Sequence, residues 1–464
     1  MKAIKRSNII LNVDSYKASH YLQYPPNTTF VSSYIEARGG DFEQGIFFGL
    51  QMFIKDYLST PITTEDVVEA KAIFEAHGVP FHEAGWQHIV DNCEGYLPIE
   101  IQALPEGTVV PVQNALVQVV NTDPECFWLT SYVETALLRA VWYPMTVATG
   151  SWHCRQIIKR YLDETADNSE GLPFKLHDFG ARGATSEEAA AVGGCAHLVN
   201  FMGTDTISAI VAARRYYSAD MAGFSIPAAE HSTMTSWGKD HETEAYANML
   251  KQFAGPGKLV AVVSDSYDLF HAIDTIWGET LIDEVKNCGG TVVVRPDSGE
   301  PVEIVLKTLE HLMNKFGHTV NSKGYRMLPD CIRVIQGDGV SRHAIEDILE
   351  AMKHNKLSAD NVAFGMGGEL LQKLNRDTMK FAMKASAVKV DGQWRDVFKD
   401  PVTDHGKRSK KGRLAVVKDN AGVFQTIAEQ ALGEQQNHLQ TVFKNGELLI
   451  ETSFDEIRAR ATVL

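Results

Sequence analysis

Hydrophobic residues in this chain gather into short runs that end abruptly at polar turn residues. The clearest run covers residues 291–294, Thr-Val-Val-Val, and shows no polar alternation, which is typical of a strand buried on both faces. It stops at residues 295–299, Arg-Pro-Asp-Ser-Gly, because proline cannot donate to a strand ladder and Ser and Gly favour a turn. The pattern predicts that Arg295 and Asp297 lie at the carboxyl end of a buried parallel strand, where α/β folds bind ligands. An ordinary turn with a surface ion pair is the alternative.

The same order of hydrophobic run, polar end and helical pattern recurs through the middle of the chain. The runs with their polar ends are residues 175–180, 197–205, 224–231, 259–268, 291–299, 331–339 and 361–369. The intervals between them are long enough for crossover helices. We therefore predict a parallel α/β barrel over residues 146–384.

The clearest helical pattern follows the run at 331–339. Ser341 is an expected N-cap, and Ile345, Ile348, Leu349 and Met352 recur at the spacing of one helical face. This pattern predicts an amphipathic helix that covers the sheet.

The two ends of the chain show shorter strands and hairpins. Strands are expected at residues 9–13, 29–36 and, several of them, 97–120, and helices at 47–57, 64–77 and 126–143. Three hairpins are expected at 388–401, with Asp391-Gly392 at its turn, and at 412–427 and 438–449. We predict that residues 1–145 and 385–464 form one discontinuous α+β domain that flanks the barrel.

Composition narrows the function classes. The 464 residues allow two or three domains, and 44% hydrophobic with 22% charged residues is ordinary for a globular protein. A net charge of −15 argues against nucleic acid or an acidic membrane as the main partner. Six scattered cysteines without a CxxC pair predict reduced thiols, neither a disulfide framework nor a zinc site. The N-terminal apolar stretch is too short for a signal sequence or a membrane span, so a cytoplasmic location is expected.

The predicted strand ends carry the candidate chemistry. They offer charged and imidazole side chains and backbone N–H groups: His177, Asp178, Arg182, Asp205, Glu230, His231, Asp265, Arg295, Asp297, Asp338 and Arg376, with Gly337, Gly339, Gly367 and Gly368. Glycines allow close backbone approach, and N–H groups ahead of a helix bind phosphate. Arginines at separate strand ends suit a ligand with phosphates at both ends. No Walker A, GxGxxG, GxSxG or HExxH motif is present.

One strongly basic run, KRSKKGR, covers residues 407–413. A solvated loop, a nucleic-acid patch and a phosphate clamp are its three interpretations. The overall charge and the lack of interleaved aromatic residues count against nucleic acid.

Together these segments resemble the nicotinamide phosphoribosyltransferase family of the type II phosphoribosyltransferases. The resemblance runs along nearly the whole chain: DSYKASHYLQYPPNT, KLHDFGARG, VNFMGTDT, PAAEHSTMTSWGKDHE, VVSDSYD, VRPDSG, RVIQGDGV, AFGMGG, VFKDP and KRSKKGRL. It implies synthesis of nicotinamide mononucleotide and pyrophosphate from nicotinamide and phosphoribosyl pyrophosphate, in the salvage of NAD. It also implies Mg²⁺, ATP as a co-substrate that phosphorylates a histidine, and a homodimer with shared active sites.

The resemblance also implies residue roles. Phe179 and the partner-donated Tyr16 would sandwich the pyridine ring, Asp205 would accept from the carboxamide N–H, and Arg295 would border this pocket. Residues that would hold phosphates or ribose are Arg182, Arg295, Gly337, Asp338, Gly367, Gly368 and Arg376, together with Arg38, Lys384, Lys399 and Lys407 donated by the partner subunit. The catalytic group would comprise His231, the phosphorylated histidine, with Asp265 and Asp297, and Asp297 would also bind Mg²⁺ or ribose.

Simpler roles remain open for several of these residues. Asp205 also fits a helix N-cap, His231 a structural histidine, and Phe179 and Tyr16 core aromatics. For Asp265, orienting His231 or capping a helix is a better interpretation than binding the substrate.

Two positions, Ala181 and Met366, depart from the family pattern, which has an aromatic and a small polar residue there.

The nearest alternative function is nicotinate phosphoribosyl transfer, and more distant ones are a phosphosugar aldolase or isomerase and a nucleic-acid-binding protein. An aldolase would need a Schiff-base lysine or an acid–base pair at a strand end, and no predicted strand ends in lysine.

Overall fold

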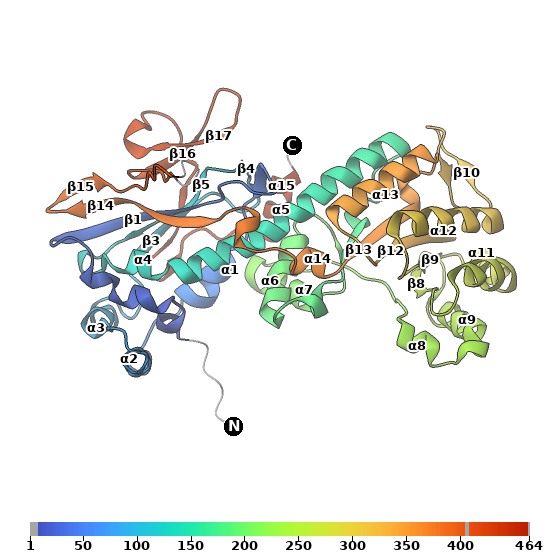
Figure 1. Cartoon of the computed structure of the whole chain (residues 1–464), viewed down its shortest axis with the longest axis horizontal. Coiled ribbons are helices and arrows are strands. Elements are labelled where there is room, and N and C mark those ends of the chain that lie inside the picture. Colours follow the sequence, from blue (N-terminus) through green and yellow to red (C-terminus); the bar gives the residue numbers. More distant parts are fainter. Residues whose placement is uncertain (1–7, 404–407, 463–464) are drawn as a thin grey trace. The chain divides into compact units, whose positions relative to one another are not determined.

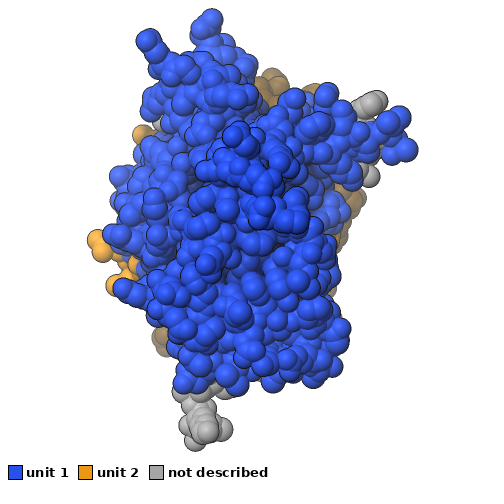
Figure 2. Space-filling model, turned by 90° about the vertical axis from the view of Figure 1, so that its left-hand side faces the viewer, with its two compact units in different colours: residues 1–149, 215–219, 374–464 blue, residues 150–214, 220–373 orange. Residues whose placement is uncertain are grey.

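The computed structural model describes residues 8–403 and 408–462, and the chain divides into two compact units. Unit 1 comprises residues 1–149, 215–219 and 374–464, and unit 2 comprises residues 150–214 and 220–373 (Figure 2). Helix α5 (Glu134–Thr165) contributes to both units, so the predicted boundary at 145/146 falls inside a continuous helix. Lys384, which we placed at the end of the barrel domain, belongs to unit 1.

Unit 1 is built on a seven-stranded sheet that combines both ends of the chain. Its strand order is β15-β14-β1-β5-β3-β18-β19. Figure 1 shows β14 and β15, from the C-terminal part of the chain, in the same sheet as β1. The bounds are β1 Thr28–Glu36, β3 Ile99–Ala103, β5 Ala115–Asn121, β14 Ala382–Val390, β15 Gln393–Asp396, β18 Gln440–Lys444 and β19 Glu447–Leu448. Two small sheets pair β2 (Gln44–Ile46) with β4 (Val109–Pro111), and β16 (Leu414–Lys418) with β17 (Phe424–Ala428).

The three predicted C-terminal hairpins are confirmed as β14–β15, β16–β17 and β18–β19. Asp391 and Gly392 have φ of 51° and 77°, the left-handed values that a tight two-residue hairpin turn requires.

The helices of unit 1 are α1 Leu50–Phe53, α2 Thr64–His77, α3 Glu83–Asn92, α4 Leu129–Tyr132, the first half of α5, and α15 Phe454–Thr462. Helix α2 keeps its predicted bounds because a capping box fixes its start. The Asp66 N–H donates to Thr63 Oγ1 at 3.3 Å, and the Thr63 N–H donates to the Asp66 carboxylate at 2.9 Å.

Unit 2 contains the predicted parallel barrel. Six parallel strands run in the order β7-β6-β13-β12-β9-β8. Their bounds are β6 Leu176–Asp178, β7 Gly203–Thr204, β8 Leu259–Val263, β9 Thr291–Arg295, β12 Ile332–Gln336 and β13 Val362–Met366. Val292, Val293 and Val294 are buried, which confirms the strand deduced from the unalternated run.

The segment 224–229 links the two edges of this sheet. Phe224 O accepts from the Thr204 N–H at 3.0 Å beside β7, and the Ala229 N–H donates to Ala261 O at 2.9 Å on β8. These parallel bridges close the ring, and Ile226 packs into the same interior cluster as Phe179 and Val293.

Helices of unit 2 accompany the strands. They are the second half of α5, α6 Glu187–His197, α7 Ile207–Tyr217, α8 His231–Thr235, α9 Glu242–Phe253, α10 Leu269–His271, α11 Ile282–Asn287, α12 Pro301–Phe316, α13 Arg342–His354 and α14 Gly368–Leu371. A short antiparallel ribbon pairs β10 (Thr319–Val320) with β11 (Arg326–Met327). Figure 1 shows α12 and α13 alongside β9 and β12.

Helix α13 confirms its prediction. The Ser341 hydroxyl caps it by accepting from the Ala344 N–H at 3.1 Å, and the four predicted apolar residues are its buried ones.

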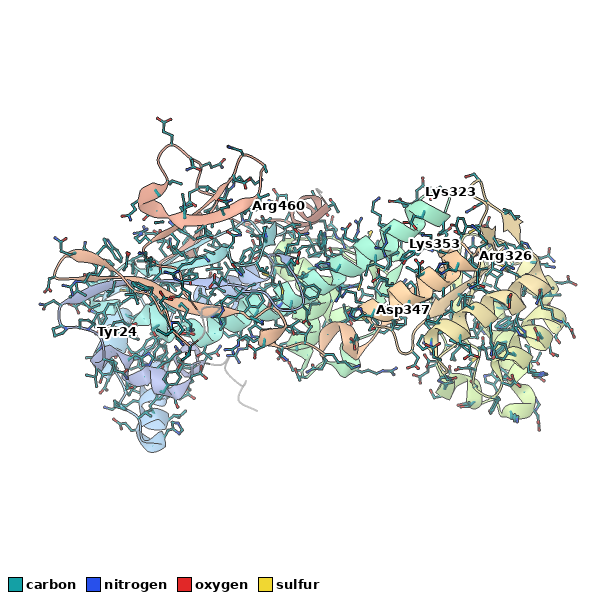
Figure 3. The ribbon with its side chains drawn as sticks, turned by 45° about the horizontal axis from the view of Figure 1, so that its top comes forward. Tyr24, Lys323, Arg326, Asp347, Lys353 and Arg460 are labelled. Carbon is teal, nitrogen blue, oxygen red and sulfur yellow. The ribbon has the colours of Figure 1, made fainter. Side chains whose placement is uncertain are left out.

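The C-terminal end of α5 is held by lysines from neighbouring segments. Lys353 pairs with Glu164 at 2.8 Å, and Lys323 donates to Asp163 O at 2.6 Å (Figure 3). Cations at this position offset the negative end of the helix dipole.

Two sequence predictions are wrong in detail. Residues 9–13 were predicted as a strand, but Ile9–Leu11 form a 3₁₀ helix because the Asn8 side chain accepts from the Ile10 N–H at 3.0 Å. The run 197–205 contributes only Gly203–Thr204 to the sheet, because α6 continues to His197. Within the described residues, every helix is too short or too polar to cross a membrane.

Candidate active site

The carboxyl ends of the parallel strands in unit 2 bring most of the predicted residues to one edge. Phe179 follows β6, Asp205 follows β7, Asp265 follows β8 and Asp297 follows β9. Gly337 and Asp338 follow β12, and Gly367 and Gly368 follow β13. The strand topology therefore collects an aromatic ring, carboxylates and glycine N–H groups.

Phe179 is held against glycines that leave room for its ring. Its N–H donates to Met366 O at 2.9 Å. A Cβ on Gly365 would come within 1.9 Å of the ring, so only glycine fits there. A Cβ on Gly337 would lie 3.5 Å from the same ring and 3.6 Å from Asp297 Oδ1, which places the ring next to that carboxylate.

His231 sits between two carboxylates at the start of α8. Its Nε2 is 3.0 Å from Asp265 Oδ1, and its Nδ1 is 3.7 Å from Asp297 Oδ2. The second oxygen of Asp265 accepts from the Asp297 N–H at 3.0 Å and from the Ser298 hydroxyl. Asp265 is thus fully engaged, while Asp297 keeps oxygens that face His231 and the Arg295 guanidinium, at 3.8 Å.

The two carboxyls differ in their electrostatics. Burial acts to raise the pKa of Asp265, but hydrogen bonds from Ser298, His231 and the Asp297 N–H outweigh it and lower the pKa. Burial, together with the charges of Asp265 and Asp338, raises the pKa of Asp297 despite Arg295 and His231. Asp265 therefore holds its charge more firmly, which suits a residue that orients the imidazole.

Asp205 lies where β7 ends. Its N–H donates to Asp178 O at 3.0 Å, and one of its carboxylate oxygens accepts from the Ser225 hydroxyl. Its neighbours on β6 favour neutral forms, because burial raises the pKa of Asp178 and lowers the pKa of His177. Asp205 is exposed, so its second oxygen is accessible to a ligand.

Several buried polar atoms at this edge have no hydrogen-bond partner among the described residues. They include Nε of Arg295 and Oε1 of Gln336, whose amide N–H donates to Asp338 O at 2.7 Å. Buried polar groups without partners are costly, and a ligand that pairs with them removes that cost.

The glycine loop at the end of β13 packs against the turn that follows Phe179. A Cβ on Gly183 would lie 3.3 Å from Gly368 Cα. Arg182 is exposed in this turn, together with Ala181, whereas Met366 is buried.

Unit 1 carries a separate pocket lined with cations. It encloses about 230 Å³ and is lined by Arg38, Arg376, Lys384 and Lys399, with Glu134 as the one acidic side chain among the described residues. Arg376, which is predicted to act with Gly367 and Gly368, belongs to unit 1 and lines this pocket, whereas the two glycines belong to unit 2.

Burial is the main cause that lowers the pKa of Lys384. The neighbouring charges of Arg38, Lys17 and Lys399 lower it further, and Glu134 opposes them. Such a concentration of cations is suited to a phosphate.

Tyr16, another predicted residue of unit 1, is not part of this pocket lining. Tyr16 is 60% exposed on a 3₁₀ helix, Ser15–Leu22, and its ring lies edge-on to His20. Its exposure argues against the core-aromatic alternative. Lys407 lies outside the described residues.

A family model described as the nicotinate phosphoribosyltransferase (NAPRTase) family matches residues 174–447, more than half of the chain. The chain belongs to this family. It is accordingly a phosphoribosyltransferase, an enzyme of pentosyl transfer. A second model, the N-terminal domain of nicotinamide phosphoribosyltransferase, matches residues 8–101.

Relatives of this phosphoribosyltransferase cover its whole length. A Xanthomonas campestris protein named nicotinamide phosphoribosyltransferase is 55% identical, and the match covers 98% of each chain. An Acinetobacter baylyi protein of the same name is 33% identical over 98% of this chain and 97% of its own.

Solved structures share the fold. Nicotinate-nucleotide pyrophosphorylase from Pyrococcus furiosus has a TM-score of 0.64 at 15% identity, covering 99% of this chain and 97% of its own. Human nicotinic acid phosphoribosyltransferase has a TM-score of 0.54 at 17% identity, covering 97% and 92%. At these identities the likeness concerns the fold alone.

Sequence reasoning missed three polar residues that lie at the candidate site. Gln336 ends an apolar strand, so its position was a usable signal. Ser225 and Ser298 carried no such signal, because only the fold brings them to Asp205 and Asp265.

Proposed function

We propose that this phosphoribosyltransferase joins nicotinamide to phosphoribosyl pyrophosphate and releases nicotinamide mononucleotide and pyrophosphate, as a step in NAD salvage. The pyridine nitrogen would form the new bond to C1 of the ribose, and the C1–O bond to pyrophosphate would break. No proton has to leave the ring nitrogen, because its lone pair is free. The names of the relatives at 55% and 33% identity support this choice of substrate.

Asp205 is the observation that carries the choice of the amide. Its exposed carboxylate lies at the end of β7, with Ser225 donating to one oxygen. The other oxygen can accept from a carboxamide N–H, whereas it would repel the carboxylate of nicotinate. Sites that depend on one such hydrogen bond prefer the correct ligand to one that lacks the bond by ~10⁴-fold.

The ring would lie on Phe179, and Tyr16 of a partner subunit would cover its other face. Phe179 has a fixed orientation between the strand ends, whereas the exposed ring of Tyr16 is available to another chain. Stacking positions the nucleophilic nitrogen without using its lone pair.

The chemistry requires stabilisation of charge. Breaking the C1–O bond builds positive charge on the ribose and negative charge on pyrophosphate. Asp297 would lie on the ribose side, and Arg182, Arg295 and the N–H groups after β12 and β13 on the phosphate side. The step requires no protein nucleophile.

The donors around Asp297 also fit a magnesium ion. Mg²⁺ prefers oxygen ligands and usually keeps several waters. Asp297 is only part-buried and has carboxylate oxygens that make no short hydrogen bond among the described residues, whereas both oxygens of Asp265 are engaged. Bound Mg²⁺ would neutralise charge on the leaving pyrophosphate.

We further propose that ATP phosphorylates His231. Asp265 fixes Nε2, which leaves Nδ1 as the nitrogen that attacks the γ-phosphorus. The P–N bond would form as the P–O bond to ADP breaks, and Asp265 would stabilise the imidazole's positive charge. Loss of the phosphoryl group to water would complete the ATPase cycle.

The cationic pocket of unit 1 would hold phosphates in a homodimer with shared active sites. Arg38, Lys384 and Lys399 line it, and Tyr16 lies in the same unit. In this arrangement unit 1 of one subunit completes the site of the other.

Separate reactions with nicotinamide and nicotinate, each with phosphoribosyl pyrophosphate and Mg²⁺, test the proposal. Mass spectrometry of the nucleotide formed should show nicotinamide mononucleotide. The alternative, nicotinate, is the substrate named in the family model for residues 174–447. Efficient conversion of nicotinate alone would establish that alternative.

A further inference from the structure

Four metal-ligating side chains from two segments of the chain, residues 88–93 and 123–126, lie near one another in unit 1. His88 lies on α3 and Cys93 is the C-cap of that helix. Asp123 is the N-cap, and Cys126 the last residue, of a 3₁₀ helix, Pro124–Cys126. The phosphoribosyl chemistry proposed above uses none of them.

Three of these donor groups converge on a small volume, and the fourth lies beside them. His88 Nε2 is 2.8 Å from Asp123 Oδ2, and one ligand atom each of His88, Asp123 and Cys126 lie within 4.8 Å of one another. The Cys93 sulfur is 3.9 Å from the same Asp123 oxygen. A histidine, a carboxylate and a thiol, with a second thiol beside them, form a ligand set of the kind that zinc binds.

We propose that His88, Cys93, Asp123 and Cys126 bind one Zn²⁺ ion that links α3 to the 3₁₀ helix. Bonds of about 2.0–2.3 Å place the ligands of a tetrahedral zinc roughly 3.3–3.8 Å apart. The hydrogen-bonded atoms of His88 and Asp123, 2.8 Å apart, therefore separate by about half an ångström, and the thiols move closer. The two thiols release their protons to solvent as the metal bonds form. The neutral imidazole of His88 binds through Nε2 and carries its single proton on Nδ1, which faces Glu125.

The surroundings already hold the ligands in place. The second oxygen of Asp123 accepts from the Glu125 N–H at 2.8 Å. The other ring nitrogen of His88 lies 3.4 Å from the Glu125 carboxylate and 3.1 Å from the Asn92 amide. Metal-bound histidines commonly donate their second ring N–H to a carboxylate, which fixes the tautomer.

The proposed metal site is buried on the side of Cys126 and open to solvent on the side of His88 and Asp123. Cys126 is fully buried, whereas the side chains of His88 and Asp123 are 21% and 24% exposed. An ion can therefore reach the ligands from solvent. Two thiolates favour zinc over Mg²⁺, which prefers oxygen ligands.

Sequence spacing gave no indication of this site, because the cysteines form no CxxC pair. The ligands come as two local pairs, His88 with Cys93 and Asp123 with Cys126. Only packing of α3 against the turn after β5 brings the pairs together.

Cobalt titration of the full-length, metal-depleted protein tests the proposal. We expect one Co²⁺ per chain with a thiolate-to-cobalt charge-transfer band, which Zn²⁺ displaces. The site at His231 can also attract divalent ions, but the predicted residues there include no cysteine, so it cannot produce this band. Cys126→Ser should lose the band, and Cys288→Ser, at a part-buried cysteine of unit 2, should keep it.

Thermal unfolding provides an independent readout. Zn²⁺ should raise the unfolding temperature of the native protein and of Cys288→Ser by several degrees. Asp123→Asn should lose this rise, although asparagine keeps the N-cap and the substitution does not touch the core. If Cys126→Ser does not fold, Asp123→Asn and Cys93→Ser decide the question.

Absence of the band in the native protein, or an unchanged band in Asp123→Asn and Cys93→Ser, would overturn the proposal. The cluster would then be an ion pair and a helix cap only.

Discussion

At the scale of single residues, the proposed reaction depends on where carboxylates keep free oxygens. Asp265 is fully engaged with His231, Ser298 and backbone, whereas Asp205 and Asp297 present oxygens toward the space at the strand ends. These differences assign an orienting role to Asp265 and ligand contacts to the other two.

Asp205→Asn should reduce the preference for nicotinamide over nicotinate by at least about tenfold, equivalent to about 1.4 kcal/mol. An amide side chain no longer repels a carboxylate and can donate to it. The ratio of the two kcat/KM values measures the effect. Ser225→Ala is the matched control, since it removes the hydroxyl that donates to Asp205 and leaves the Asp205 carboxylate in place. An unchanged ratio in Asp205→Asn would remove Asp205 from substrate recognition.

His231→Ala should abolish ATP hydrolysis and the stimulation of nucleotide synthesis by ATP, because no acceptor nitrogen remains. His241, which pairs with Glu244 at 3.2 Å on the surface, is the matched control, and His241→Ala should keep both. Both activities are measured with and without ATP. Full ATP stimulation in folded His231→Ala would contradict phosphorylation at this residue.

Lys384 should make binding of phosphoribosyl pyrophosphate sensitive to alkaline pH. Its pKa is lowered, chiefly by burial, so it loses its charge below the ordinary lysine pKa of about 10.4. The KM for phosphoribosyl pyrophosphate should therefore rise with pH before ordinary lysines titrate. Lys384→Arg should flatten this rise, because arginine stays charged. The same alkaline limb in both proteins would exclude Lys384 as its source.

At the scale of elements, the sequence predicted what local patterns determine. Short hydrophobic runs with polar ends identified β8, β9, β12 and β13, and N-capping residues set the starts of α2 and α13. The failures arose where tertiary contacts override the pattern. Asn8 turned an apolar stretch into a 3₁₀ helix, and the segment 224–229 closes the ring through isolated bridges instead of a regular strand.

Strand β13 supports the aromatic floor of the site through a glycine. Gly365→Ala would drive its Cβ into the Phe179 ring, and such overpacking costs about 1–3 kcal/mol. We expect the KM for nicotinamide to rise by about tenfold. Gly255→Ala is the control, because its Cβ would meet only the flexible Lys258 side chain at 3.6 Å. If the KM for nicotinamide is equal in the two variants, the Phe179 ring does not bind the pyridine.

At the scale of the whole molecule, the residues named for one reaction fall in two units. Local patterns predicted the barrel, and they predicted that both ends of the chain form one flanking domain. They did not predict that Arg376 and Lys384 belong to the cationic pocket of unit 1, because unit membership depends on long-range packing.

The proposed shared site predicts complementation between inactive subunits. Tyr16→Ala removes a group from unit 1, and Arg295→Ala removes one from unit 2. In a mixed dimer one site contains neither lesion, so activity should recover to about half of the native value per dimer. Purified heterodimers carrying two different affinity tags provide the measurement. Heterodimers as inactive as their parents would show that each chain acts alone.

Competition between the two pyridines tests the central claim most directly. Equal concentrations of nicotinamide and nicotinate are supplied with limiting phosphoribosyl pyrophosphate and Mg²⁺, so that the ratio of products equals the ratio of the kcat/KM values. The Asp205 carboxylate predicts almost exclusively nicotinamide mononucleotide, with an excess of up to ~10⁴-fold. A predominance of nicotinate mononucleotide, or no nucleotide at all, would contradict the proposed function.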